Sequence, residues 1–351
     1  MIIGSCGYGA TGSSVLTDLL SEYDDVQLFD SFEFVVAYRV DGLQDLEYHL
    51  MKRYAKCASG DYAIKRFLEW TKCYKTPLIN KPCDGEKFYK LSKDYINAIT
   101  QLKYRGVETA DVLSGNVIKN VFAFASKKVF MPKIVEKITH KPAFLWPCRT
   151  INYSIEPDNF YEESRKYISS ILNAMGADLS KPICLDQPFE GNCPQNSFPF
   201  FDNPYAIVID RDPRDLYFDE KYTTSPDGKF FPRTNVEDFV VYYRNMRKHI
   251  VDHPRVLRIR FEELIYEYDE SIRKIEQFLH LGEHKRPKTG FNPERSINNT
   301  QQIRLHPEDK KEIEYIEREL PEYLFPFEKY PNAQFKGKPF YGAARNAIEA
   351  K

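Results

Sequence analysis

The sequence of 351 residues predicts an α/β protein whose central parallel sheet is flanked by helices in a three-layer, P-loop-like fold. Three observations lead to this class. A short apolar run at the N-terminus is followed by a glycine-rich turn, residues 7–12. A helical pattern and a second short apolar run, residues 26–29, come next and complete a β-α-β unit. Residues 205–210 form a third run, apolar up to Asp210 and therefore typical of a buried strand.

The N-terminal turn approaches the spacing of a phosphate-binding loop, Gly7-x-x-x-x-Gly12-Ser13-Ser14. Glycines let the backbone turn tightly and approach a ligand closely, and the unpaired N–H groups at the start of the following helix attract an anion. Ser13 stands where a nucleoside triphosphatase has lysine, which argues against an ordinary kinase or ATPase. The alternative is a strand–helix connection that binds no ligand.

The predicted helix after this turn spans residues 13–23, and the second strand, 26–29, follows it. Asp30 and Glu33 come directly after that strand. Because ligands of open parallel sheets bind at the carboxyl ends of the strands, we expect both carboxylates near the glycine-rich turn.

Residues 40–180 are predicted to be a mostly helical insertion, or cap, within one domain of residues 1–351. Its predicted helices are 43–57, 61–74, 85–104, 116–138 and 157–175. Residues 41–150 carry 20 Lys and Arg against 11 Asp and Glu, a local charge of +9, so the rest carries 30 against 40, or −10. A basic segment suits an anionic ligand, and a scatter of solvated lysines is an equally good explanation.

Strands and helices alternate beyond the insertion. The predicted strands are 183–188, 205–210 and 255–260. One predicted helix begins at Pro213, and the others span 236–251, 269–280 and 307–320.

Composition narrows the class of protein. A net charge of −1 indicates no nucleic-acid partner. Seven cysteines without C-x-x-C or metal-ligand spacing indicate no metal site and reduced thiols, as in a cytoplasmic protein. The first strand begins too near Met1 to leave room for a signal peptide, and no apolar run reaches the roughly 18 residues of a membrane span.

Residues 211–215, Arg-Asp-Pro-Arg-Asp, resemble an element of the sulfotransferases that use 3′-phosphoadenosine 5′-phosphosulfate (PAPS). The N-terminal turn resembles the donor-binding loop of that family, residues 258–264 resemble a strand end that reads Tyr/Phe-Glu-Glu/Asp-Leu, and residues 272–281 resemble the helix after it. These pieces stand in the family's order over residues 1–34 and 183–282. The resemblance implies a P-loop-like fold, PAPS as the donor, no metal, and sulfuryl transfer to a hydroxyl.

The resemblance also implies roles for single residues. The turn would hold the 5′-phosphosulfate, Arg211 would contact the 3′-phosphate, and residues 284–300 resemble a late loop that closes over the nucleotide. The implied donor-binding residues are Gly9, Ala10, Thr11, Gly12, Ser13, Ser14, Arg211, Asp219, Arg295 and Ser296. A guanidinium at a strand end can hold a phosphate with two hydrogen bonds, whereas a surface ion pair is the alternative for Arg211. For Arg214 a structural role, paired with Asp212 or Asp215, is the better explanation.

Two positions depart from the family. Ala10 stands where members carry Lys or Arg, a cation that stabilises charge on the bridging oxygen as the sulfuryl group leaves. Asp219 stands where members carry a Ser that binds the 3′-phosphate. Candidate replacement cations in the insertion are Arg39, Lys65, Arg66 and Lys119.

The acceptor hydroxyl needs a base. Glu33 stands where glycan-modifying members have Glu, with Asp30 as the second candidate, and a helix-capping carboxylate is the alternative. Among the histidines only His140, in the basic insertion, is kept as a reserve candidate.

The sequence therefore predicts a cytoplasmic PAPS-dependent sulfotransferase acting on a hydroxyl of a saccharide or glycan. The rival hypotheses are a non-catalytic or altered-donor relative that binds a nucleotide or anion and, more distantly, a P-loop small-molecule kinase.

Overall fold

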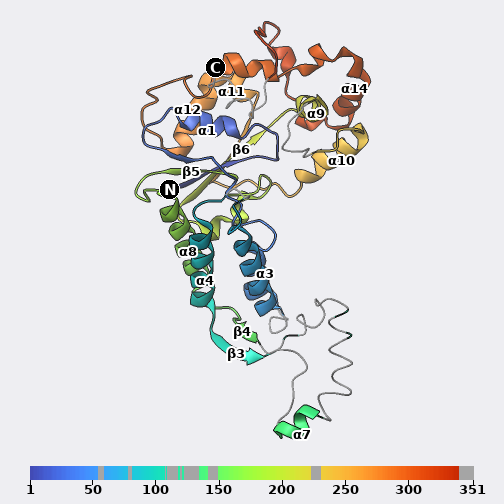
Figure 1. Cartoon of the computed structure of the whole chain (residues 1–351). Helices are drawn as coiled ribbons and strands as arrows, with labels where there is room; N and C mark the ends of the chain where they lie inside the picture. Colours follow the sequence, from blue (N-terminus) through green and yellow to red (C-terminus); the bar gives the residue numbers. More distant parts are fainter. Residues whose placement is uncertain are drawn as a thin grey trace. The chain divides into compact units, whose positions relative to one another are not determined.

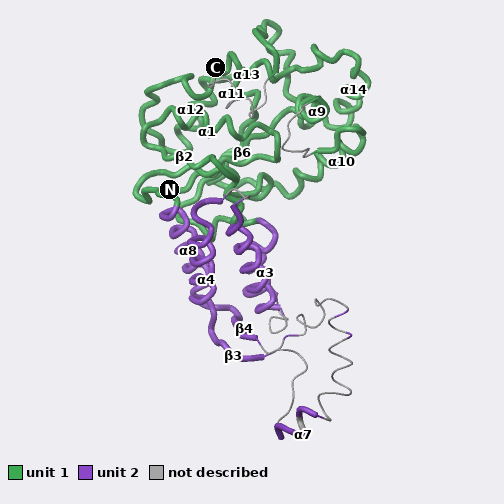
Figure 2. Tube along the Cα trace, in the orientation of Figure 1, with its two compact units in different colours: residues 1–38, 175–351 green, residues 39–174 purple. Residues whose placement is uncertain are grey.

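The computed structural model of the chain describes residues 1–53, 59–77, 81–106, 108, 118, 121, 134–140, 149–222 and 231–339. The chain forms two compact units, shown in different colours in Figure 2. The first, unit 1, combines residues 1–38 with 175–351, and the second, unit 2, spans residues 39–174. The bounds of unit 2 lie close to the range 40–180 of the predicted insertion.

A five-stranded sheet forms the centre of unit 1 (Figure 1). Its order is β2 (Gln27–Phe29), β5 (Ile183–Asp186), β1 (Ile2–Cys6), β6 (Pro204–Asp210) and β7 (Val256–Arg260). Every pairing in it is parallel, which confirms the predicted class of sheet. The chain leaves β1 toward β2 on one side and later crosses from β5 to β6 on the other, so the order reverses at β1. A crevice at such a point is where open parallel sheets bind ligands.

The register of the strands brings their carboxyl ends to one edge of the sheet. Ser5 lies opposite Asp186 of β5, and Cys6 lies opposite Val208 of β6. Asp210 lies opposite Arg260 of β7. The segments that follow β1, β5, β6 and β7 therefore begin as neighbours.

One face of the sheet packs against helices. Helices α1 (Ser14–Leu20), α11 (Glu263–Tyr266) and α12 (Tyr268–Leu279) contribute to one hydrophobic core with the sheet. Leu16 and Ile275 are fully buried there with Ile3 and Ile207 of the sheet. Each such side chain contributes about 1.5–3 kcal/mol of stability by leaving water.

An irregular aromatic segment covers the other face of β1 within unit 1. A Cβ atom at Gly4 would lie 2.5 Å from the Phe189 ring, so only glycine leaves room for that ring. Phe189 and Phe200 are fully buried, and the chain between them makes only short 3-10 turns, Pro194–Asn196 and Phe198–Phe200. Unit 1 by itself therefore departs from the expected three layers on this face.

A second hydrophobic core lies between three helices of unit 1: α9 (Pro213–Tyr222), α10 (Val236–Met246) and α14 (Lys310–Glu319). The predicted helix 236–251 ends early, at Met246, and the predicted helix 307–320 begins with the 3-10 turn Pro307–Asp309. This core fixes α9, which directly follows the end of β6.

Unit 2 is mainly helical in the part described. It contains α2 (Leu43–Glu47), a π-helical turn (Tyr48–Lys52), α3 (Gly60–Cys73), α4 (Gly85–Ile99), α7 (Glu136–Thr139) and most of α8 (Phe160–Met175). The predicted helix 61–74 is confirmed, whereas most of 116–138 lies outside the described residues.

The predicted helix 85–104 is wrong in its last turn. It ends at Ile99, and β3 (Leu102–Gly106) pairs antiparallel with β4 (Arg149–Tyr153). The reason lies in the local pattern, because Leu102-Lys103-Tyr104-Arg105 alternates apolar and charged residues with the period of a strand.

Candidate active site

The turn after β1 has a conformation that favours glycine. The φ angles of Gly9, Ala10 and Gly12 are 78°, 50° and 85°. Ala10 has a Cβ atom, so its left-handed backbone costs free energy that glycine would not. The buried Thr11 fixes the turn, since its Oγ1 accepts a hydrogen bond of 3.2 Å from the Tyr8 N–H.

A row of backbone donors in this turn is unpaired. Within the described part of the chain, the N–H groups of residues 9–14 donate no hydrogen bond, and the helical bonds start with Val15 N–H to Gly12 O. Ala10 and Ser14 are exposed. Successive unpaired N–H groups in a turn with left-handed residues form a concave anion site. The turn therefore has the donors of an anion site without any side-chain cation of its own.

Gln187 ties this turn to the end of β5. Its Oε1 accepts a 3.2 Å hydrogen bond from the Gly7 N–H, and its Nε2 donates to Ser13 Oγ at 2.9 Å. One side chain thus spans the beginning and the end of the turn. The sequence prediction did not include Gln187, although its position directly after an apolar run was the available signal.

Asp186, the last residue of β5, is the second functional candidate that the sequence prediction missed. It is half-buried, and burial together with the nearby charges of Glu33 and Asp30 raises its pKa to about 7. No hydrogen bond or ion pair of its carboxylate is formed with another described residue. A carboxyl group that titrates near neutral pH is suited to take a proton from an acceptor hydroxyl.

The two predicted base residues lie in the same electrostatic neighbourhood. Asp30 and Glu33 are both exposed, and both act on the pKa of Asp186. The Phe34 N–H donates to the Asp186 backbone carbonyl at 2.7 Å, which fastens the segment after β2 to the end of β5. The structure therefore brings three carboxylates together where the sequence prediction had two.

Arg211, which follows β6, is buried in an ion pair. Its Nη1 contacts Asp219 Oδ2, and its Nη2 donates to the Asn299 carbonyl at 2.5 Å. Only 4% of Arg211 and 7% of Asp219 is exposed. Burial raises the pKa of Asp219, although Arg211 and Gln302 act against this. The surface ion pair considered for Arg211 is thus a buried one.

Phe261 connects Arg211 with the glycine-rich turn. The Arg211 guanidinium lies 5.0 Å from the centre of the Phe261 ring. A Cβ atom at Gly12 would lie 3.1 Å from the same ring. The two sequence-predicted donor-binding positions therefore both lie against one side chain.

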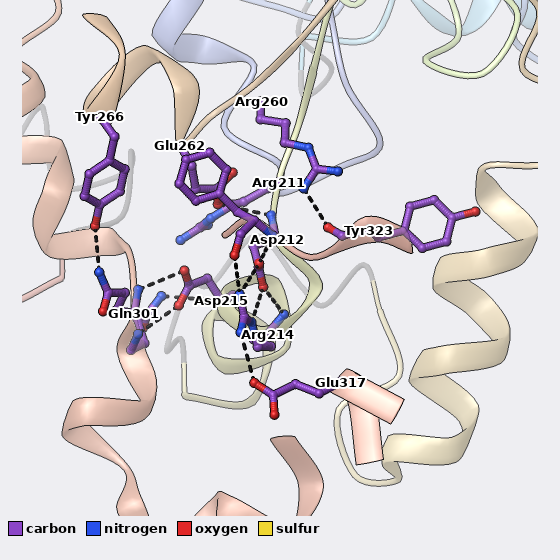
Figure 3. A network of polar contacts seen from close by, with 12 residues as sticks. Arg211, Asp212, Arg214, Asp215, Arg260, Glu262, Tyr266, Gln301, Glu317 and Tyr323 are labelled. Carbon is purple, nitrogen blue, oxygen red and sulfur yellow. Dashed lines mark hydrogen bonds and ion pairs between the residues drawn. The ribbon is translucent and has the colours of Figure 1, made fainter. Parts of the chain in front are cut away.

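Figure 3 shows the polar network beside Arg211. The Arg214 guanidinium makes two hydrogen bonds to the fully buried Asp212, at 2.9 and 2.7 Å, and one to Glu317 at 2.9 Å. The predicted structural role of Arg214 is confirmed. Asp215 instead accepts from the Gln301 and Gln302 N–H groups, at 2.9 and 2.8 Å.

Glu262 completes this network. It is fully buried and accepts a 3.1 Å hydrogen bond from the Asp212 N–H. Burial and the neighbouring Asp212 and Asp215 raise its pKa, and burial and Asp212 likewise raise the pKa of Asp215. Arg211 therefore lies among several buried carboxyl groups.

Two of the predicted donor-binding residues lie on α13 (Pro293–Ser296). Arg295 is exposed and Ser296 is buried. Of this late loop, the Asn299 backbone carbonyl, rather than either of these side chains, forms the hydrogen bond to Arg211.

The candidate cations of the insertion belong to unit 2. Arg66 forms an ion pair with Asp41, Arg39 lies 5.9 Å from the Trp70 ring centre, and Lys65 lies 5.8 Å from that of Tyr62. His140 is exposed, and Lys119 lies outside the described residues.

The described residues contain no cluster of three or more His, Cys, Asp or Glu side chains that could hold a metal ion. In the same part of the chain, no helix combines the length and the apolar character needed to cross a membrane. The thiols of Cys6 and Cys184 are buried in the sheet, and burial raises their pKa.

Comparisons with known proteins give little support for any family. No protein-family model matches the chain, and no curated protein matches it. Among solved structures, the chain is similar to the crystal structure of sulfotransferase STF9 from Mycobacterium avium, with 12% sequence identity and a TM-score of 0.31. The similarity covers 96% of this chain and 78% of that one. A likeness of this degree decides neither the fold nor the activity.

Proposed function

We propose that this chain transfers a sulfuryl group from an activated nucleotide sulfate to a hydroxyl. One observation carries the proposal: the backbone N–H groups of residues 9–14, which donate no hydrogen bond within the described part of the chain, are joined through Gln187 to Asp186, whose carboxyl group has a pKa near 7. An anion site and a base are the two groups that this reaction requires. PAPS as the donor and a saccharide or glycan as the acceptor are what the sequence resemblance implies.

The chemistry follows from these two groups. The acceptor oxygen attacks sulfur in line with the bridging oxygen, a carboxylate takes the acceptor proton, and the donor's phosphate oxygen keeps the electron pair of the broken S–O bond. Backbone N–H groups of the turn would stabilise the negative charge on the peripheral oxygens. Asp186 is our first choice for the base, and Glu33 and Asp30 are the alternatives that the resemblance suggests.

The turn contains Ala10 in place of a cation. The positive charge that would stabilise the leaving group must therefore come from another segment, or the reaction proceeds without it. Arg39, Lys65, Arg66 and Lys119 of the insertion stay the candidates.

The test combines binding with turnover. Thermal unfolding is followed with adenosine 3′,5′-bisphosphate, adenosine 5′-monophosphate and ATP–Mg²⁺, and labelled sulfate transfer is measured on a panel of saccharides. Stabilisation by an adenosine mono- or bisphosphate together with transfer to a saccharide supports the proposal. Stabilisation by ATP–Mg²⁺ alone would instead favour the kinase hypothesis.

A second candidate function is a non-catalytic relative that binds the nucleotide without transfer. Ala10 favours it, because the turn lacks the cation that would stabilise the leaving group. Tight binding of the nucleotide with no transfer to any saccharide, from either a 3′-phosphorylated or a 3′-hydroxyl donor, would decide for this candidate.

A further inference from the structure

Arg211 already has an anionic partner inside the protein. Asp219 follows it by eight positions and lies on α9, where its Oδ2 contacts Arg211 Nη1. Both side chains are more than nine-tenths buried. The positive charge that an arginine at a strand end would offer to a phosphate is thus neutralised by the chain itself.

The other two nitrogens of the Arg211 guanidinium are also shielded from a phosphate. Nη2 donates to the Asn299 carbonyl, and Nε is buried without a hydrogen-bond partner among the described residues. The Phe261 ring lies against the group. A phosphate could reach Arg211 only by displacing Asp219 or by lying directly beside its carboxylate.

Asp219 is itself held in place. Gln302, which is 1% exposed, donates from its Nε2 to the other carboxylate oxygen, Oδ1. The Gln302 backbone N–H donates to Asp215 Oδ1 at 2.8 Å, which holds Gln302 against α9. Both Asp219 oxygens therefore have partners, and removing one member of such a buried pair is strongly unfavourable.

The surroundings of Arg211 contain further carboxyl groups, and burial raises the pKa of both Asp215 and Glu262. Asp215 and Glu262 are buried and act electrostatically on Arg211. The next arginine, Arg214, is bonded to Asp212 and Glu317. Arg211 and Arg214 are thus both paired with carboxylates, whereas the nearby Arg260 and Arg304 donate to the Tyr323 and Asn298 backbone carbonyls.

We propose that Asp219 is the permanent anion of this site and that the donor is a nucleotide with a phosphosulfate at its 5′ position and a free hydroxyl at its 3′ position. This inference rests on the proposed function and selects among its donors. Arg211 then has a structural role, whereas the turn of residues 9–14 alone holds the charged end of the donor.

The reaction balances with such a donor. The acceptor oxygen forms a bond to sulfur as the bond between sulfur and the bridging oxygen breaks. The nucleoside 5′-monophosphate leaves with the electron pair, and the acceptor proton passes to a carboxylate at the end of β5 or β2. The products are a sulfate ester and the monophosphate.

The test compares two products on the intact protein. We measure binding of adenosine 5′-monophosphate and of adenosine 3′,5′-bisphosphate by calorimetry and by thermal shift. The monophosphate should bind at least as tightly as the bisphosphate. A preference for the bisphosphate of about tenfold or more would overturn the inference and leave the proposed function standing. Binding of neither nucleotide would overturn the proposed function.

A charge-removing variant tests Asp219 itself. Asp219→Asn keeps the size of the side chain and frees Arg211 for a phosphate, so it should tighten bisphosphate binding about tenfold and leave monophosphate binding unchanged. Glu317→Gln, at the half-exposed partner of Arg214, is the matched control and should change neither. A folded Asp219→Asn protein with the same ratio of bisphosphate to monophosphate affinity as the wild type would contradict the role of Asp219. If the variant does not fold, the comparison of the two nucleotides on the wild-type protein still tests the inference.

Discussion

Glu22 and Phe291 join two distant parts of unit 1. The fully buried Glu22 carboxylate, just after α1, accepts hydrogen bonds from the Phe291 and Gly290 N–H groups at 2.9 Å each, and it also contacts His284. A Cβ atom at Gly290 would lie 2.1 Å from the Asp18 carbonyl, so the loop passes very close to α1. The segment before α13 is therefore fastened to the helix that follows the candidate anion site.

Glu22→Ala should destabilise the protein by about 3–5 kcal/mol, because it leaves buried N–H groups without an acceptor. The change is measured as the free energy of unfolding in urea. Asp24→Ala is the matched control, since Asp24 is exposed and its ion pairs in the described residues are with the exposed Lys285 and Arg286, so the change should cost less than about 1 kcal/mol. Equal losses for the two variants would refute the role of Glu22.

The elements that sequence analysis predicted well are those specified by local patterns. The strand 205–210 and the helix 61–74 follow from uninterrupted apolar or periodic residues, and both are present. The pairing of Arg214 with Asp212 was also foreseen, because the two residues are near neighbours in sequence. The strand at Leu102–Gly106 was missed because a short alternating run adjoined a long helical one.

The parts of the site that were missed depend on contacts between distant segments. Burial raises the pKa of Asp186, and the pairing of β2 with β5 adds to this effect because it places Asp30 and Glu33 near the carboxyl group. The bonds that occupy Arg211 and its partner Asp219 come from Asn299 and Gln302, in a loop more than 80 positions away. No local pattern encodes either arrangement.

Asp186 should make the stability of the protein depend on pH. Its pKa is about 7 in the folded protein against an ordinary 3.8, so the folded state binds this proton more tightly. The resulting stability is fully present below about pH 4 and is lost as the pH rises through 7. One pKa unit corresponds to about 1.4 kcal/mol, so between pH 5 and pH 8 the wild type should lose about 1–3 kcal/mol more than Asp186→Asn.

Urea unfolding of both proteins at the two pH values measures this difference. The subtraction removes the contributions of Asp215 and Glu262, whose raised pKa values act in the same direction in both proteins. Parallel pH curves for the wild type and Asp186→Asn would show that Asp186 does not hold its proton in the folded state.

The same residue should control turnover if the proposed function is right. A base must be ionised to accept a proton, so kcat should rise with pH along a titration curve whose midpoint lies near pH 7. Asp186→Asn should lower kcat by about 10²–10⁴-fold and remove that limb of the profile, with donor binding unchanged. Glu33→Gln is the matched comparison, because Glu33 is exposed. A larger loss of kcat in Glu33→Gln than in Asp186→Asn would assign the base to Glu33 instead.

The unpaired N–H groups of the turn can be tested one at a time. Ser13 has a φ angle of −54°, which proline adopts without strain, and it lies just before α1, where proline is tolerated. Ser13→Pro removes one donor and the hydroxyl that Gln187 contacts, whereas Ser13→Ala removes only the hydroxyl. Relative to Ser13→Ala, Ser13→Pro should weaken binding of adenosine 5′-monophosphate by about 1.5–3 kcal/mol, the value of a hydrogen bond to a charged group. Calorimetry on both variants, with thermal unfolding to verify that each is folded, gives the difference, and equal affinities would exclude the Ser13 N–H from the anion site.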